Sequence, residues 1–537
     1  MTIPRRQVIL AFQALLPGED HPRAATIEID LESGTIISVQ DGIVPPPTQE
    51  GVEVIRVEDG KVVLPGLVDT HVHLNQPGRT EWEGFQTGSL AAISGGVTTL
   101  IDMPLNSIPP TTTVEGLRVK QEEARRVGVN SDLGFWGGII PGNQGELVGM
   151  LKEGVRGFKC FLIESGVDEF PCVDEDDLLQ ACEALKGTNA LILFHAELDA
   201  SGSCCPGSGG SESESESKIT PKVNGHSHNH KLDHNHAEPQ TQPSISSAIT
   251  SASASASSSA SASASYSEFL ESRPESFELT ALHLILKFAK LYPDLRFHIV
   301  HLSAASAIPL IRNARSSPLA GGLGIRNLTV ETCFHYLCLS SEEIASDFST
   351  EYKCCPPIRD ESNRQKLIRG LLDGDIDYVV SDHSPCVPEL KKGDFLESWG
   401  GVSSLGLGLS LLYTQLGPSV IHTDRSKAKD KDKDEDKDKE RISLGRLVDW
   451  LSASQAKQVN LANKGALKVG YKADWVIFDP KAEWTVTSDS LLFKNKMSPY
   501  IGKTLKGLVE KTFLGGKLVW DHTKGIDGVT FSQGELL

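Results

Sequence analysis

The chain has 537 residues and a formal net charge of −19 at pH 7. Apolar side chains make up 39% of it, enough for a sizeable core, but no run of them approaches the ~20 residues of a membrane-spanning helix. The acidic balance argues against a nucleic-acid or anionic-membrane partner, because both require a basic face. The ten cysteines lack the spacing of a disulfide framework, so we expect a reducing compartment, the cytoplasm.

The two ends of the chain share one pattern. Residues 1–62 contain short turn-bounded strands such as TIEIDLESGTIISV, and residues 465–537 contain others such as VEKTFLGGKLVWD. The apolar patch at residues 8–16 runs into Pro17 and Gly18 with no small-residue cleavage site after it, so we interpret it as a first strand rather than a signal peptide. Both ends together are therefore expected to form a small β-sandwich.

Between these ends, short apolar runs rich in β-branched residues alternate with helical stretches. The runs lie, in chain order, at residues 67–73, 97–103, 133–139, 155–161, 190–195, 296–302, 328–334 and 376–382. Strand–helix units in series predict a parallel sheet, and eight of them predict one that closes on itself. We therefore expect an α/β fold, with a (β/α)8 TIM-type barrel over residues 63–464 beside the sandwich.

Two segments inside the barrel region lack the composition of a packed core. Residues 199–267 contain Ser-Glu repeats, a His-rich stretch at 226–236 and a Ser-Ala tract, and residues 423–440 are a run of lysine and acidic residues. Because large apolar side chains are scarce, neither segment can offset the entropy lost on ordering. Both are predicted to be disordered insertions.

Possible metal ligands gather where the predicted barrel strands end. Five of the strands carry one or two of them: His71, His73, Lys159, His195, His301 and Asp382. Active sites of such barrels lie at the carboxyl ends of the strands, and residues two apart on a strand face the same way, as the first two histidines do. A lone strand histidine is more often a core residue than a ligand. The joint occurrence at equivalent strand ends is what indicates a site for a zinc-like ion.

Lys159 favours two metals over one, although four histidines and one aspartate could just fill a single site. A lysine can bridge two ions only after its amine takes up carbon dioxide and becomes a carbamate. That step requires the neutral amine, which burial favours by lowering the pKa of lysine. The sequence therefore predicts a pair of metal ions bridged by carboxylated Lys159.

Four motifs resemble those of the cyclic amidohydrolases of the amidohydrolase superfamily, and within them the allantoinase branch. They are LPGLVDTHVHLNQPGRTEWEGF (64–85), GFKCF (157–161), KCCPPIRD (353–360) and SDHSPC (381–386), and the resemblance covers the whole chain except the two insertions. It implies a homotetramer that binds two zinc ions per subunit and opens the hydantoin ring of allantoin. One zinc would be held by His71, His73 and Asp382, and the other by His195 and His301.

The same resemblance suggests residues that contact the substrate. Asn75 stands where dihydroorotases, which share this motif, carry an arginine, and a neutral amide suits a ureido-substituted hydantoin better than an anion. Ser384 and backbone atoms near Cys333 would orient the imide edge of the ring, while Asp382 would act as the catalytic base. Two positions depart from the family pattern, Gln76 in place of glutamate and Phe334 in place of proline.

Three alternatives stay open at this point. A sister enzyme (a dihydropyrimidinase, hydantoinase or dihydroorotase) would share the metal chemistry but not the neighbours of Asn75. A catalytically inactive scaffold normally loses at least one ligand, whereas this chain keeps all six. A metal-buffering protein acting through the His-rich stretch would leave the ligands on the barrel strands unexplained.

Overall fold

The computed structural model describes residues 5–46, 51–199, 264–344, 349–417 and 442–537. Its helices are α1 (Phe85–Ser94), α2 (Val114–Val127), α3 (Gln144–Lys152), α4 (Glu175–Leu185), α5 (Tyr266–Ser272), α6 (Glu275–Leu291), α7 (Ile308–Arg315), α8 (Phe334–Cys338), α9 (Glu361–Asp373), α10 (Gly408–Leu416), α11 (Leu444–Leu451) and α12 (Ala453–Gln458). Within the described ranges, no helix has both the length and the apolar character needed to cross a membrane.

A ring of parallel strands forms the centre of the fold. Its strands are β6 (Leu67–Val72), β7 (Val97–Asp102), β8 (Asp132–Phe135), β9 (Gly137–Gly138), β10 (Phe158–Phe161), β11 (Leu191–His195), β12 (Arg296–Ile299), β13 (Leu328–Cys333) and β14 (Tyr378–Val380). They pair in chain order as two sheets, β6-β7-β8 and β9 to β14. Because β8 and β9 are one strand interrupted at Trp136, eight strands in all make up the ring, as predicted.

Two contacts close the ring. The amide of Trp136 donates to Asp102 of β7 at 2.9 Å, so the strand continues across its interruption. At the other seam, Val72 and His383 form a parallel bridge, and the amide of His73 donates to the carbonyl of His383 at 2.8 Å. The predicted β/α barrel is therefore confirmed. Strands β6, β7 and β11 are buried along their whole length, because helices and other strands cover both faces.

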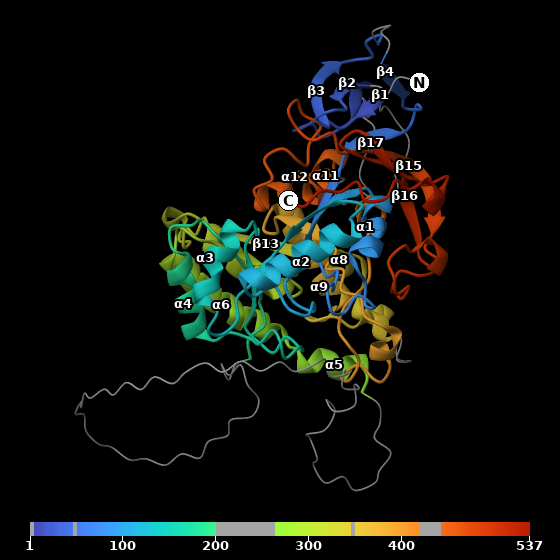
Figure 1. Cartoon of the computed structure of the whole chain (residues 1–537). Coiled ribbons are helices and arrows are strands. Elements are labelled where there is room, and N and C mark those ends of the chain that lie inside the picture. Colours follow the sequence, from blue (N-terminus) through green and yellow to red (C-terminus); the bar gives the residue numbers. More distant parts are fainter. Residues whose placement is uncertain (1–4, 47–50, 200–263, 345–348, 418–441) are drawn as a thin grey trace, which may run out of the picture. The chain divides into compact units, whose positions relative to one another are not determined.

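Strands from both ends of the chain form one further sheet (Figure 1). Its members are β1 (Arg6–Ala14), β2 (Arg23–Asp30), β3 (Thr35–Asp41), β4 (Val52–Arg56), β5 (Val62–Pro65), β15 (Trp475–Thr485), β16 (Thr504–Leu514) and β17 (Lys517–Asp521). β15 joins the two halves by pairing with β5 on one side and β16 on the other. A core of its own, in which Trp475 stacks on Phe513 at 3.7 Å between ring centroids, supports this sheet. The predicted domain boundaries, at residues 62/63 and 464/465, stay a prediction.

The predicted insertions fall mostly on residues outside the described part of the chain, 200–263 and 418–441. At the end of the first one the prediction was wrong, because Tyr266 and Ser267 belong to helix α5. Ser265 caps that helix by accepting from the amide of Glu268, and the side chains of Tyr266 and Phe269 are buried. The two buried aromatic rings provide the apolar burial that stabilises this short helix.

Candidate metal centre and active site

All six predicted ligands line one cavity of about 250 Å³ at the carboxyl ends of the barrel strands. His71 lies in β6 and Lys159 in β10, while His195 is the last residue of β11. The other three, His73, His301 and Asp382, follow within two residues of a strand end. Parallel strands bring these positions together because every strand of the barrel ends on the same side.

His71, His73 and Asp382 form the first group of candidate ligands. The Nε2 atoms of the two histidines lie 3.2 and 3.4 Å from Oδ1 of Asp382, and all three side chains are nearly enclosed. Their donor atoms lie within 4.8 Å of one another, a spacing at which one metal ion can contact all three.

Lys159, His195 and His301 form the second group. Nε2 of His301 lies 3.1 Å from Nδ1 of His195 and 3.5 Å from Nζ of Lys159. Lys159 is 1% exposed, which is unusual for a lysine that makes no ion pair within the described residues. The lysine amine therefore faces the same space as the two imidazoles.

Two of the ligands have a backbone conformation that side-chain-bearing residues rarely adopt. His301 and Asp382 both have φ of 43°, in the left-handed region. A residue other than glycine in this conformation destabilises the folded state by about 1–3 kcal/mol. The conformation persists only where the surrounding structure holds the residue in place. Both residues lie two positions after a strand end, of β12 and β14, and both line the cavity. The strain at these two residues therefore lowers the stability of the barrel, and the surrounding contacts offset it.

Side chains behind the cavity contact the second nitrogen of three imidazoles, and two of these partners are carboxylates. Nδ1 of His71 lies 2.5 Å from Glu331, and Nε2 of His195 lies 2.7 Å from Glu197. Nδ2 of Asn106, an amide nitrogen and therefore a donor, lies 3.3 Å from Nδ1 of His73. The two carboxylates select the tautomer of His71 and of His195 that leaves a lone pair directed toward the cavity.

Charges around the first group favour a cation. Burial would lower the pKa of His71, but the carboxylates of Asp382 and Glu331 outweigh it and raise that pKa to about 9. Burial would raise the pKa of Asp382, but the charge of His71 and hydrogen bonds from His71 and His73 hold it well below its ordinary value. With Nδ1 of His71 bonded to Glu331, its Nε2 lone pair faces a carboxylate oxygen, and only a proton or a metal ion relieves that contact. The donor set therefore fits a divalent metal ion.

In the second group burial outweighs the neighbouring charges. It lowers the pKa of Lys159 to about 8, against the pull of Asp382 and Glu331, and it also lowers the pKa of His195 and of His301. All three groups are therefore biased toward their neutral forms. These forms are the ones that bind a metal ion or, for the amine, react with carbon dioxide.

The three predicted substrate contacts differ in their positions. Ser384 lines the cavity, whereas Asn75 and Cys333 are not among the described residues that do so. The amide nitrogen of Asn75 donates to the carbonyl of Pro385 at 3.2 Å, and its buried Oδ1 has no partner among the described atoms. Asn75 thus holds the loop that carries Ser384. Cys333 is fully buried at the start of α8.

The two departures from the family pattern, Gln76 and Phe334, are buried and are not among the described residues that line the cavity. Gln76 accepts from the amide of Phe85 at 2.9 Å and donates to Glu123 at 2.7 Å. Phe334 is buried, and its ring lies so close to Gly408 that a Cβ there would be 2.2 Å away. Glycine at position 408 therefore makes room for the phenylalanine.

Several residues of the cavity were not anticipated from the sequence. Arg273 lines it and donates to Glu197 at 2.7 Å, and Trp399 and Lys353 complete another part of the wall. The sequence could have identified Glu331, because a charged residue inside an otherwise apolar barrel strand requires a buried partner. No sequence feature pointed to Arg273, since it follows the long insertion and stands far along the chain from the other residues of the cavity.

A closed β/α barrel with four imidazoles, a lysine and an aspartate around one cavity defines the class of the metal-dependent hydrolases. The family model "Amidohydrolase family" matches residues 62–519. An allantoinase of Saccharomyces cerevisiae is 41% identical over 98% of this chain and 97% of its own length. An allantoinase of Arabidopsis thaliana is 35% identical over 92% of this chain and 85% of its own. The chain belongs to the amidohydrolase family, among the allantoinases.

Solved structures agree on the fold. An L-hydantoinase (dihydropyrimidinase) from Arthrobacter aurescens superposes with a TM-score of 0.74 over 100% of this chain and 99% of its own, at 22% identity. A dihydropyrimidinase from Brevibacillus agri gives a TM-score of 0.71 at 21% identity, over 99% of this chain and 98% of its own. At these identities the likeness extends to the barrel and its accompanying sheet.

Proposed function

We propose that this protein is a hydrolase that opens the hydantoin ring of allantoin to give allantoate. The observation that carries the proposal is the convergence of all six donors on one cavity, in a chain whose curated relatives are allantoinases. The cavity, about 250 Å³, has room for a single small ring with a short substituent. A small, uncharged substrate agrees with the mixed lining, in which Arg273 and Lys353 are offset by Glu164 and Glu397.

The metal content follows from the two groups of ligands. His71, His73 and Asp382 would hold one zinc ion and His195 and His301 the other, with carboxylated Lys159 bridging both. Bound ions of this kind polarise a carbonyl and lower the pKa of water from 15.7 towards 7. Asp382 takes the proton from the attacking water and passes it to the ring nitrogen that departs when the amide bond breaks.

Lys159 has the environment that carboxylation needs. The neutral amine attacks the carbon of CO₂, a nitrogen–carbon bond forms, and one proton is released to solvent. A pKa of about 8 leaves a substantial neutral fraction at neutral pH, whereas an unburied lysine is almost wholly protonated there. The resulting carbamate supplies the negative charge that the second group otherwise lacks.

Substrate orientation would come from the loop after Asp382. Ser384 lines the cavity, and the hydrogen bond from Asn75 to Pro385 fixes the loop beside it. We propose that Ser384 contacts the imide edge, that Asn75 acts by positioning this loop, and that backbone atoms near Cys333 complete the orientation. As a homotetramer in the cytoplasm, the protein would act on a dissolved metabolite.

Turnover by the purified, zinc-supplemented full chain tests the proposal. We expect hydrolysis of allantoin and at least 100-fold slower hydrolysis of hydantoin, dihydrouracil and dihydroorotate. The variant Lys159→Ala should lose the metal and the activity together. Preference for another ring would assign the protein to a sister activity. A fully metallated protein with no turnover on any of the four would support an inactive scaffold.

A further inference from the structure

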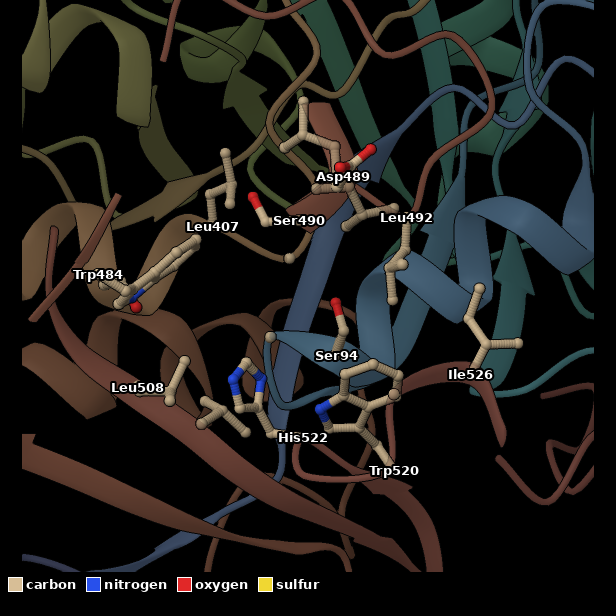
Figure 2. Close-up of a pocket in the computed structure, with 17 residues that line it drawn as sticks. Ser94, Leu407, Trp484, Asp489, Ser490, Leu492, Leu508, Trp520, His522 and Ile526 are labelled. Carbon is tan, nitrogen blue, oxygen red and sulfur yellow. The ribbon is translucent and has the colours of Figure 1, made fainter. Parts of the chain in front are cut away.

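A second cavity, of about 270 Å³, lies away from the metal ligands. It is bounded by the end of α1, the start of α10, strands β16 and β17, and two short 3-10 helices, Ser488–Ser490 and Gly525–Gly528. Figure 2 shows its apolar side chains arranged around an open space: Leu407, Trp484, Leu492, Leu508, Trp520 and Ile526. None of its lining residues lines the catalytic cavity. The two cavities are therefore separate.

Trp520 gives this cavity a specific polar contact. The residue is 5% exposed, and its indole Nε1 has no hydrogen-bond partner among the described residues. In Figure 2 that nitrogen lies on the side of the ring that faces the open space and His522. The other indole of the wall differs, because Nε1 of Trp484 donates to the carbonyl of Gly507 at 3.0 Å. A buried donor without a partner is costly, so an acceptor delivered by a ligand would be favoured here.

The lining also specifies the charge of a ligand. Among the described residues that line the cavity there is no lysine or arginine, and the one acidic residue, Asp489, would repel an anion. The two indoles and the seven leucine, isoleucine and valine side chains of the described lining favour a flat apolar body. We propose that this cavity is a binding site for a neutral, flat small molecule that presents one carbonyl-type acceptor to Trp520.

The proposed site adjoins the segments that hold His383, the neighbour of Asp382. The amides of Ser404 and Leu405 lie 3.2 and 3.4 Å from Nδ1 of His383, and Leu405 lines the second cavity. The ring of Phe493 lies 5.1 Å from that of His383, and its neighbour Leu492 also lines the second cavity. A molecule bound in the second cavity would therefore contact Leu405 and Leu492. These residues belong to the two segments that hold His383, next to Asp382.

Fluorine NMR of the metallated full chain, with its seven tryptophans replaced by 5-fluorotryptophan, tests the site. The probes are 1-indanone, a flat neutral bicycle with one carbonyl, and indane, which lacks only that oxygen. We expect the Trp484 and Trp520 signals to shift saturably with 1-indanone, while the Trp399 signal of the catalytic cavity stays fixed. Indane should bind roughly 3- to 10-fold more weakly, the range for one hydrogen bond.

Trp520→Phe is the matched variant, because it keeps a ring and removes a donor that has no partner among the described residues, so folding should be unaffected. In this variant the Trp484 signal should still respond, but 1-indanone should bind no better than indane. Trp484→Phe, whose donor is already satisfied, should keep the preference for 1-indanone. The proposal is overturned if the Trp399 signal moves instead, if neither indole of the site responds, or if Trp520→Phe keeps the preference.

An effect on turnover is also expected, and this part rests on the proposed function. Occupancy by 1-indanone should lower the kcat for allantoin at least twofold with KM unchanged, and Trp520→Phe should be much less sensitive. An unchanged kcat at saturating probe would exclude coupling to the catalytic cavity. If the chain did not turn over allantoin at all, the fluorine signals would still report the site independently.

Discussion

Two of the four imidazoles in the catalytic cavity have a carboxylate behind the ring that fixes which nitrogen carries the proton. His71 has Glu331 on Nδ1, His195 has Glu197 on Nε2, and each has its other nitrogen facing the cavity. Glu331 also contacts Nε2 of His298 at 3.0 Å, so its carboxylate is held on two sides. Burial would raise the pKa of Glu331, but the charges of His71 and His298 and hydrogen bonds from both keep it at about 2. This carboxylate therefore stays ionised at every physiological pH.

Glu331→Gln should weaken metal binding about 10- to 100-fold, because the amide removes the charge that fixes the tautomer of His71. The measurement is metal content by mass spectrometry after dialysis against a graded series of chelator concentrations. Glu278→Gln is the control, since Glu278 is also a buried carboxylate but bonds Arg359 and backbone amides rather than an imidazole. Equal metal retention by both variants would contradict the role given to Glu331.

Asp382→Asn should lower kcat about 10²- to 10⁴-fold, because an amide cannot accept and return the proton of the attacking water. Turnover and metal content are measured on the same sample, so that loss of a ligand is separated from loss of the base. Asp176→Asn, at an exposed position of α4, should leave both quantities unchanged. Near-normal turnover by metallated Asp382→Asn would remove Asp382 from the proton transfer.

At the scale of secondary-structure elements, a buried ion cluster ties the terminal sheet to the barrel. Nζ of Lys464 lies 2.6 Å from both Asp132, the first residue of β8, and Asp474, which directly precedes β15. All three side chains are at most 5% exposed. Burial would lower the pKa of Lys464, but the two carboxylates outweigh it and raise the pKa well above its ordinary value. The lysine is therefore charged whenever the protein is folded.

Lys464→Met should destabilise the protein by about 3–5 kcal/mol, because it leaves two buried carboxylates without their counter-ion. Urea denaturation of the metallated chain measures this change in the free energy of unfolding. Lys457→Met, at an exposed position of α12, is the matched control and should fall within about 0.5 kcal/mol of the parent. A small effect of Lys464→Met would mean that water reaches and solvates the two aspartates.

At the scale of the whole molecule, the bound metal ions should contribute to stability, because they bind the folded chain and not the separated ligands. Removal of the metal with a chelator should lower Tm by roughly 5–10 °C, and added zinc should restore it. Differential scanning calorimetry at fixed protein concentration gives the comparison. Lys159→Ala should already melt low and should respond to neither treatment; a response equal to that of the parent would assign the effect to metal bound elsewhere.

Much of the barrel and its ligands could be predicted from the sequence alone. Each parallel strand is buried on both faces, so it appears as a short apolar run, and a histidine or lysine at its end stands out against that background. His71 and His73 share a direction because side chains on a strand alternate with a period of two. These properties are local, and neighbours along the chain determine them.

Only the tertiary structure decided which distant residues meet. It paired Glu331 with His71 and placed Arg273 beside Glu197. It also directed Asn75 toward Pro385 and the unpartnered indole of Trp520 into a second cavity. Such contacts depend on the angle at which each helix and loop packs back onto the barrel, and hydrophobic periodicity carries no information on that angle. For this protein, the local sequence pattern determined where the candidate metal ligands stand on the strands. The groups that orient them were determined by packing between segments far apart in the chain.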